Sequence, residues 1–418
     1  MGRSGRLTVL CQDVLFPPTH GGRAETWHLV RGLRAHGIDL QLACWTEHGE
    51  RIAPDDMRGL RQVASDVVEV PRRTGIRRFM SLRYPPKMLA WVPTLNEYIR
   101  LLQRVSDYRP DWILFDSWPG YLTGLRVSQA LGVPLLYRSC NIEYLYFQHL
   151  YSTATGRMKL QLGLNALRMN ALECRIRRSV DLVLDISESD AAHWRERGDG
   201  GRSIVASPVW TQPHHARSQV IRDIDVLFVG NLRTPNNRAG LAWFTERVVS
   251  ALQAGGAGMP RIVFAGSSPD PAAVAAWMNQ GVECIANPVD VAPLYARAKV
   301  LINPLQTGFG VNVKMIEILA NGARAVSTNA GATGLPGAIR SLFGITDDPV
   351  EFAAMIRREL ATPTDDSPQD ERRQLFDKVF GPATLGPLIQ EMYRLSAAKR
   401  AAPPGPAHAP IPNSPALD

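Results

Sequence analysis

The sequence predicts an α/β protein made of two doubly wound, Rossmann-like domains that face each other across a cleft. Short apolar segments alternate with amphipathic stretches along the chain, as expected for parallel strands joined by helices. This alternation stops in a proline-rich, polar segment at 207–223 and then starts again. A chain of 418 residues is also about twice the size of one hydrophobic core. Two domains are therefore predicted.

In the first half, the strands are apolar runs bounded by Gly, Pro or polar residues. We predict them at 7–10, 38–43, 67–70, 112–115, 135–137, 182–186 and 203–206. Helical periodicity between them predicts helices at 24–36, 92–105 and 158–178. These elements form the predicted first domain, residues 1–207.

The second half repeats the pattern, with predicted strands at 226–229, 262–265, 282–285, 300–303 and 325–327. They form a predicted domain at 223–375, joined to the first by a linker at 208–222. A helix at 376–397 is predicted to return to the first domain. The Pro- and Ala-rich residues 398–418 are predicted to be disordered.

Composition places the chain in a broad class. Apolar residues make up 45% and charged residues 21%, which is typical of a globular protein in water. We find neither a membrane-spanning run nor a signal peptide, and therefore expect a cytoplasmic protein. The cysteines form no CxxC pair, which fits a reducing compartment and argues against a zinc site. They are Cys11, Cys44, Cys140, Cys174 and Cys284.

Basic and aromatic residues alternate in "PRRTGIRRFMSLRYPPKMLAW", residues 71–91. Such a segment can bind an anionic membrane surface, which would make the protein peripheral on the inner face of the membrane. A solvated loop explains the pattern equally well. Nucleic-acid binding through residues 72–87 is a weaker hypothesis, and we expect no nucleic-acid partner.

The stretch "LINPLQTGFGVNVKMIEILANG", residues 301–322, places a lysine where a helix disfavours one. A strand leads into a Gly308-Phe309-Gly310 turn, and a helix follows. We expect this helix to bury Val313, Ile316, Leu319 and Ala320 and to expose a stripe of Lys314, Glu317 and Asn321. Lys314 lies in the first turn, where the helix dipole disfavours a cation by about 0.3–1 kcal/mol.

A bound anion would explain this lysine. If a diphosphate lies on the backbone amides of residues 310–313, Lys314 becomes its charge-assisted partner. Glu317, one turn further on, then suits paired sugar hydroxyls. The alternative is a Lys314–Glu317 pair on an ordinary helix surface, contributing about 0.2–0.5 kcal/mol. We favour the ligand because strand, glycines, Lys and Glu occur together in the expected context.

With this motif in place, the chain resembles the retaining GT-B glycosyltransferases of glycosyltransferase family 4. The strongest match runs from "GVECIANPVDVAPLYARAKVLINP" through the glycine turn to "STNAGATGL". The segment "DVLFVGNLRTPNNRAGLAWF" resembles the start of the family's second domain. Two others, "YRSCNIEYLYF" and "ECRIRRSVDLVLDISESDA", resemble parts of its first domain. The segments also occur in the family's order.

The resemblance implies transfer of a sugar from a nucleoside-diphosphate sugar to a glycan or lipid-linked glycan, with retention. It implies no cofactor and no required metal. Lys314 and Arg233 would neutralise the leaving diphosphate, and Glu317 would hold the ribose. The other donor-binding residues implied are Gly21, Gly22, Asn287, Gly308, Phe309, Gly310, Val311 and Asn312. For Gly21-Gly22 an ordinary turn, and for Arg233 a solvated loop, remain alternatives.

Three departures from the family pattern affect the expected activity. No acid precedes the glycine turn, where Gln306-Thr307 stands, and Pro235-Asn236-Asn237 replaces a second basic residue. The candidate catalytic residues Cys140, Asn141 and Glu143 carry a thiol where the family has an imidazole. A non-catalytic nucleotide-sugar binder, or a partner subunit of a glycan-assembly complex, is therefore the alternative function.

Three remaining features suggest sites less strongly. "DID" at 223–225 imitates a metal-binding DxD, but it adjoins a predicted strand and we favour a role at the strand end. His214-His215 lacks a spaced partner, which argues against a metal ligand. Asp116 and Trp118 could line an acceptor site or pack within a loop, and both interpretations stay open.

Overall fold

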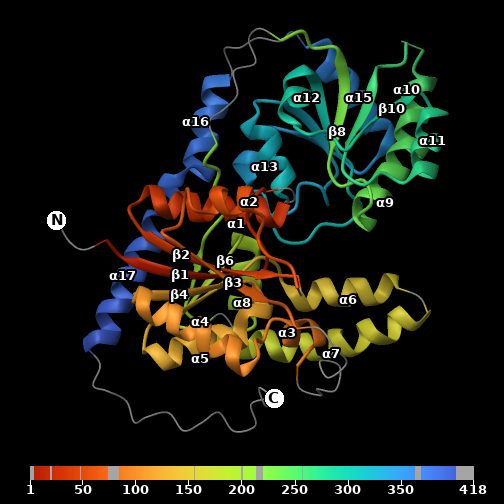
Figure 1. The fold of residues 1–418 in the computed structure, drawn as a ribbon. Coiled ribbons are helices and arrows are strands. Elements are labelled where there is room, and N and C mark those ends of the chain that lie inside the picture. Colours follow the sequence, from red (N-terminus) through yellow and green to blue (C-terminus); the bar gives the residue numbers. More distant parts are fainter. Residues whose placement is uncertain are drawn as a thin grey trace. The chain divides into compact units, whose positions relative to one another are not determined.

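The computed structural model describes residues 4–18, 21–47, 49–73, 84–154, 156–198, 201–212, 220–256, 258–362 and 369–401. Contacts divide the chain into two compact units. The first unit is Met1–Val209 with Pro382–Asp418, and the second unit is Trp210–Gly381. Each unit contains one parallel sheet with helices around it (Figure 1). The predicted fold class, two doubly wound α/β domains, is confirmed.

The first unit has a 7-stranded sheet in the order β3-β2-β1-β4-β5-β6-β7. Its central strands are apolar runs buried on both faces, as a covered parallel sheet requires, and its two edge strands are mostly half-buried. The strands are β1 (Arg6–Cys11), β2 (Asp39–Thr46), β3 (Asp66–Pro71), β4 (Trp112–Asp116), β5 (Leu135–Ser139), β6 (Leu182–Asp185) and β7 (Ser203–Val205). The order reverses between β1 and β4, where ligands of such sheets bind.

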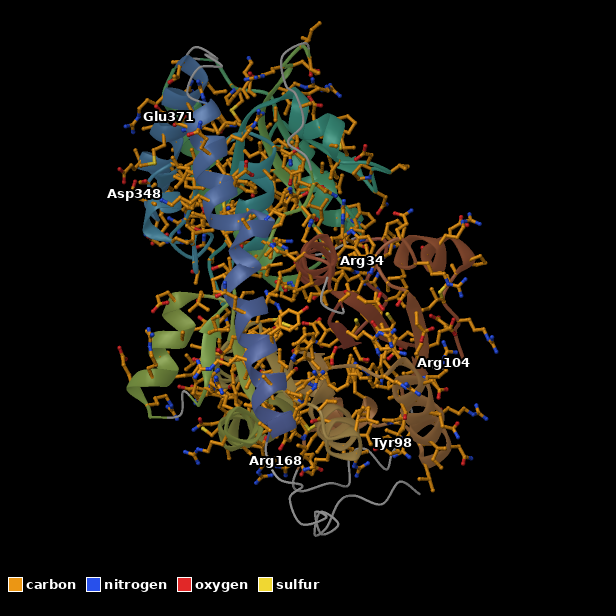
Figure 2. All side chains as sticks on the ribbon, turned by 90° about the vertical axis from the view of Figure 1, so that its left-hand side faces the viewer. Arg34, Tyr98, Arg104, Arg168, Asp348 and Glu371 are labelled. Carbon is orange, nitrogen blue, oxygen red and sulfur yellow. The ribbon has the colours of Figure 1, made fainter. Side chains whose placement is uncertain are left out.

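Helices cover both faces of this sheet (Figure 1). One layer of the core contains side chains of α1 (Gly21–Ala35), α2 (Pro54–Leu60), η4 (Pro382–Leu385) and α17 (Gly386–Ala401). The other contains side chains of α3 (Pro86–Ala90), α4 (Leu95–Tyr108), η2 (Trp118–Gly120), α5 (Tyr121–Leu131), α6 (Glu143–Thr153), α7 (Gly156–Ser179) and α8 (Glu188–Glu196). Figure 2 shows Arg104 of α4 at the surface, where it pairs with Asp66.

The second unit has a 6-stranded sheet in the order β10-β9-β8-β11-β12-β13. Its strands are β8 (Ile224–Val229), β9 (Ile262–Gly266), β10 (Val282–Ala286), β11 (Ala298–Asn303), β12 (Arg324–Ser327) and β13 (Gly344–Ile345). The strand β13 was not predicted, because two residues beginning with glycine give no period. The order reverses between β8 and β11.

The second unit has an aromatic contact cluster in which Phe244 packs against Phe264 of β9 and against Phe352, and nine helical segments surround its sheet within the described residues. They are α9 (Pro235–Trp243), the π-helical η3 (Phe244–Val249), α10 (Ser250–Ala254), α11 (Pro271–Met278), α12 (Ala292–Arg297), α13 (Val313–Ala320), α14 (Gly337–Arg340), α15 (Pro349–Ala361) and α16 (Gln369–Phe380). Asp348, labelled in Figure 2, accepts hydrogen bonds from the Val350 and Glu351 amides and so caps α15.

Three predicted elements differ from the structure. The helix expected at 376–397 is broken at Gly381-Pro382 into α16, η4 and α17, since proline cannot continue a helix. The α17 helix continues through Ala401, so 398–401 are helical, and the rest of the predicted tail lies outside the described residues. The predicted helix at 92–105 begins at Leu95, because Thr94 and Glu97 form a capping box.

The predicted linker at 208–222 is only partly described, and 213–219, with His214-His215, lie outside the described residues. Its beginning is well packed. Val209 is buried in the core of the first unit, and the Trp210 amide donates to the Phe380 carbonyl within the second. In the described part of the chain, no helix has both the length and the apolar character needed to cross a membrane.

Candidate functional site

The carboxyl ends of β8 and β11 define the candidate site of the second unit. These strands are neighbours at the point where the strand order reverses. Parallel sheets bind ligands at this point, outside the carboxyl ends of the strands. The loop after β8 leads to α9, and the loop after β11 contains the glycine turn and leads to α13. Most of the predicted donor-binding residues lie on these two loops.

The glycine turn is held by the loop that follows β12. A Cβ atom on Gly308 would lie 2.2 Å from the Ala330 carbonyl oxygen and 2.4 Å from Thr333 Oγ1. Gly310 has a φ of 59°, which favours glycine. The Asn312 amide donates to the Thr333 carbonyl at 3.3 Å. The turn is therefore close-packed against its neighbour, and its backbone has one defined course.

Lys314 extends from the first turn of α13 towards the loop after β8. Its Nζ donates to Asn237 Oδ1 at 3.3 Å and lies 3.9 Å from the centre of the Phe228 ring. Burial lowers the pKa of Lys314 to about 7, although the charge of Glu317 raises it. No ion pair of Lys314 is found among the residues that the structure describes. The amine is thus a poorly solvated cation held by neutral groups.

The stripe predicted to be exposed is not exposed. Lys314 and Glu317 are half-buried and Asn321 is buried. Burial raises the pKa of Glu317, whereas Lys314 and a hydrogen bond with the Tyr295 side chain lower it. The prediction was wrong because α12 and the loop after β8 cover this side of the helix. The ordinary surface pair considered above therefore does not describe these residues.

The predicted buried face of α13 needs one correction. Ile316, Leu319 and Ala320 are buried as expected, together with Met315 and Ile318, whereas Val313 is only half-buried. Val313 is the first residue of the helix and lies next to the turn, so fewer neighbours cover it.

Asn236 and Thr307 stand where the family resemblance implied a base and an acid, and their side chains contact each other. Asn236 Nδ2 donates to the Thr307 carbonyl at 2.9 Å, and Thr307 Oγ1 donates to Asn236 Oδ1 at 2.8 Å. Thr307 stands where an acid was expected, and Asn236 where a base was expected. A neutral pair therefore joins the loops after β8 and β11. The sequence gives no signal for this pair, because its two residues are 71 positions apart.

Two other predicted residues of the second unit make their described hydrogen bonds with groups other than Lys314. Asn287 follows β10, at the edge of the sheet, and its Oδ1 accepts a hydrogen bond from the Ser268 amide at 2.9 Å. This contact joins the loop after β10 to the loop after β9. The side chain of Arg233 is exposed on the loop after β8, and its amide donates to Asn231 Oδ1 at 2.9 Å.

The carboxyl edge of the first unit carries buried acids. Thr26 Oγ1 of α1 donates to Asp116 Oδ2 at 2.8 Å, and Cys140 Sγ lies 3.8 Å from Asp116 Oδ1. Burial, followed by the charge of Glu25, raises the pKa of Asp116 to about 6. Burial also raises the pKa of the Cys140 thiol well above its usual value. This thiol is therefore neutral near pH 7.

The other predicted catalytic residues lie at the start of α6. Burial raises the pKa of Glu143 to about 7, while Lys87 and hydrogen bonds with the Asn141 and Trp118 side chains lower it. Trp118 is 1% exposed, so it packs within the first unit. Gly21 and Gly22, predicted to bind the donor or to form an ordinary turn, are the exposed first residues of α1.

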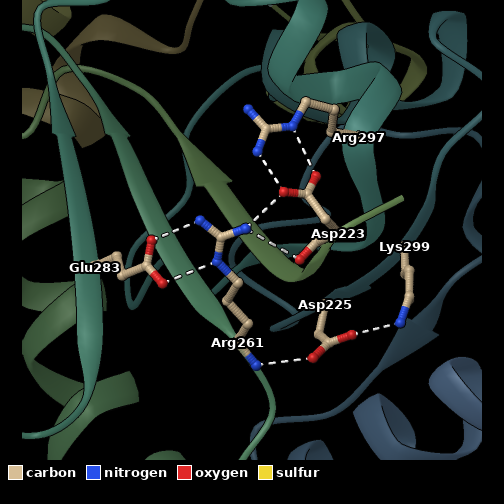
Figure 3. A network of polar contacts seen from close by, with 6 residues as sticks. All are labelled: Asp223, Asp225, Arg261, Glu283, Arg297 and Lys299. Carbon is tan, nitrogen blue, oxygen red and sulfur yellow. Dashed lines mark hydrogen bonds and ion pairs between the residues drawn. The ribbon is translucent and has the colours of Figure 1, made fainter. Parts of the chain in front are cut away.

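The acids of "DID" are occupied by ion pairs (Figure 3). Asp223 pairs with Arg261 and Arg297, and Asp225 Oδ1 pairs with Lys299 at 2.7 Å. The Arg261 amide donates to Asp225 Oδ2 at 2.8 Å. Both carboxylates thus fix the amino end of the sheet, as a role at the strand end requires. Within the described residues, no group of three or more His, Cys, Asp or Glu side chains could hold a metal ion.

Part of the basic segment at 71–91 is used inside the first unit. Arg72 pairs with Glu47, donates to the Gln12 carbonyl at 2.9 Å, and lies 4.6 Å from the centre of the Trp91 ring. Arg72 therefore joins the ends of neighbouring strands. Arg77, Arg78 and Arg83 lie outside the described residues.

Comparison with known proteins connects this geometry to a family. Residues 20–210 match the model described as "Glycosyl transferase 4-like domain", and residues 223–362 match "Glycosyl transferases group 1". A protein of the cps region of Klebsiella pneumoniae, itself uncharacterised, is 23% identical over 84% of this chain and 90% of its own length.

Two solved structures share the fold over nearly the whole chain. Sucrose-phosphate synthase from Thermosynechococcus elongatus has a TM-score of 0.64 at 15% identity, covering 94% of this chain and 99% of that one. HepE from Anabaena, solved in complex with UDP, has a TM-score of 0.58 at 14% identity, covering 93% and 99%. HepE was also solved in complex with UDP-glucose.

The packing of the glycine turn makes a prediction for Gly308→Ala. The added Cβ would meet the Ala330 carbonyl, which is backbone and cannot rotate away. We expect the unfolding free energy to fall by about 1–3 kcal/mol, the range for overpacking. Gly337→Ala is the matched control, since a Cβ there meets nothing within 4 Å and should change stability by no more than about 0.5 kcal/mol. Equal denaturant midpoints for the two variants would contradict this account of the turn.

Proposed function

Because this chain belongs to the GT-B glycosyltransferases, we propose that it moves a sugar from a nucleoside-diphosphate sugar to a glycan or lipid-linked glycan. We propose that the anomeric configuration is retained and that no metal is required. The observation that carries the donor assignment is the poorly solvated Lys314 beside a glycine turn, at the point where strand order reverses. A diphosphate is the ligand that such a cation and such a turn suit best.

The comparisons support the donor and acceptor classes. HepE, with a similar fold, binds UDP and UDP-glucose in its structures, which supports a nucleotide-sugar donor here. The relative from the cps region supports a glycan acceptor. Lys314 would stabilise the charge that develops on the leaving diphosphate, and exposed Arg233 would join it. Glu317 would accept hydrogen bonds from the ribose hydroxyls.

Transfer itself is tested by release of nucleoside diphosphate from a panel of donors with candidate oligosaccharide acceptors. Turnover that needs an acceptor and survives chelation of metals supports the proposal, and the anomeric signal of the product gives the stereochemistry. The competing function is a non-catalytic nucleotide-sugar binder. Its motivation is the neutral Cys140 thiol in place of an imidazole. Tight donor binding without turnover across the panel would favour that binder and overturn the proposed activity.

Lys314→Ala should weaken nucleoside-diphosphate binding by about 1.5–3 kcal/mol, the range for a hydrogen bond to a charged group. The unfolding free energy should change little, because removing the contact with Phe228 also removes a poorly solvated charge. Lys314→Arg is the matched control and should retain most of the affinity, because it keeps the charge. Calorimetric titration measures both, and unchanged affinity in Lys314→Ala would remove the phosphate site.

Glu317→Ala should weaken nucleoside diphosphates more than inorganic pyrophosphate, which has no ribose. The comparison is best made at pH 6, where Lys314, with its pKa of about 7, still carries its proton. An equal loss of affinity for the two ligands would mean that Glu317 acts only through its effect on Lys314, and it would reject the ribose contact.

We also propose that residues 71–91 dock the first unit on an anionic membrane, where a lipid-linked acceptor could reach it. Arg72 is engaged in its own unit, so the useful change is Arg77/Arg78/Arg83→Ser. Each basic residue near such a surface contributes about 1 kcal/mol, so binding to anionic vesicles should fall by about 150-fold at most. Replacing the exposed Arg34, Arg58 and Arg61 is the matched control. Equal losses in both triple variants would reject a specific docking segment.

A further inference from the structure

The question that the candidate site leaves open is what fixes Lys314 before a ligand arrives. A lysine side chain has several freely rotating bonds, and ordering it is costly in entropy. In this structure, Nζ lies over the Phe228 ring at 3.9 Å and within 3.3 Å of Asn237 Oδ1. The ring face defines one direction of approach, and the amide oxygen defines the other.

The Asn237 amide is itself fixed, and its orientation is unambiguous. Its Nδ2 donates to the Asn231 carbonyl oxygen at 2.7 Å, and a carbonyl can only accept. Its Oδ1 faces the Lys314 ammonium, which can only donate. Only one of the two flipped orientations of the amide therefore satisfies both hydrogen bonds. Asn237 therefore connects the backbone of the loop after β8 to the Lys314 amine on α13 by two hydrogen bonds.

The neighbouring contacts fix the start of α9, which carries Asn237. Asn236 is joined to Thr307 by two hydrogen bonds, and Pro235 begins the helix. Gly230 leaves room for the arrangement, since a Cβ there would lie 3.1 Å from Lys314 Nζ and 3.2 Å from Asn237 Nδ2. The segments that follow β8 and β11 are thus hydrogen bonded to each other, and the first of them also contacts Lys314.

We infer that Asn237 is a positioning residue, which holds the Lys314 ammonium for an anionic phosphate without neutralising it. This inference rests on the proposed function of the same site. A carboxylate at this place would hold the amine too, but as an ion pair that a diphosphate must first break. A neutral amide oxygen orients the cation and leaves its charge for the ligand. The Phe228 ring, also neutral, acts in the same way.

The groups around Lys314 allow a specific test. Among the described residues, the charge that acts on it is Glu317 of α13, which hydrogen bonds with Tyr295 of α12. The titration midpoint of the Lys314 amine therefore depends on the charges placed next to it. Acylation of Lys314 by an amine reagent, followed across pH by mass spectrometry of the peptide, gives its titration midpoint in the ligand-free protein.

Asn237→Asp should move this midpoint up, because a carboxylate favours the charged amine, and Asn237→Leu should move it down. Both variants should bind inorganic pyrophosphate at pH 6.5 at least tenfold more weakly than the unchanged chain. Ala239→Leu is the control, because Ala239 lies on the same helix but is exposed, and it should leave both the midpoint and the pyrophosphate affinity unchanged. A residue that only stabilised the loop would not move the midpoint in opposite directions.

Unchanged midpoints in both Asn237 variants would overturn the inference, and so would pyrophosphate affinity equal to that of the unchanged chain. If one variant fails to fold, the direction seen in the other still decides. Lys314→Ala separates this result from the proposed function. If that variant binds pyrophosphate normally, the site assignment itself fails. If it binds weakly while the Asn237 variants bind normally, only the role of Asn237 fails.

Discussion

The ammonium group of Lys314 is the constraint that organises the carboxyl edge of the second unit. A cation withdrawn from water is unfavourable unless other groups replace its hydration. Here the replacements are the Phe228 ring and the Asn237 amide oxygen, and burial lowers the pKa of the amine to about 7. A cation in these surroundings is poorly compensated. It gains most from a ligand that brings negative charge.

The loops next to Lys314 are held in place by uncharged groups. The glycine turn packs against the loop after β12, where Asn303 Nδ2 donates to the Gly331 carbonyl at 2.9 Å. Such contacts hold the backbone course of the turn without using a charged side chain. A network of paired charges lies instead at the opposite edge of the sheet, around Asp223 and Arg261. Because those charges are paired, they fix the sheet and leave the field at Lys314 undisturbed.

The strand order of the first unit reverses in the same way as that of the second, but acidic side chains lie at the carboxyl ends of its strands. Its carboxyl edge carries acids whose pKa is raised by burial, Asp116 to about 6 and Glu143 to about 7. Such groups can donate or accept hydrogen bonds near neutral pH, and they disfavour a second anion.

Sequence periodicity was enough to predict both sheets and the glycine turn, because buried parallel strands and glycine-dependent turns leave strong local signals. It missed β13, which is too short to have a period, and it predicted one helix at 376–397, where the structure has a break at Gly381-Pro382. The exposed stripe on α13 was also wrong. Periodicity places residues on one face of a helix, but covering that face depends on loops distant in sequence. For the same reason, the Asn236–Thr307 and Asn237–Lys314 contacts could not be predicted, since each joins residues more than 70 positions apart.

The central claim is that Lys314 and the glycine turn hold a diphosphate. A crystal structure of the protein with a nucleoside diphosphate chosen from a binding screen tests it most directly. The account predicts a phosphate oxygen about 2.7–3.2 Å from Lys314 Nζ, with the backbone amides of residues 310–313 around the same group. A nucleotide bound elsewhere, with Lys314 still directed to Asn237 alone, would contradict it.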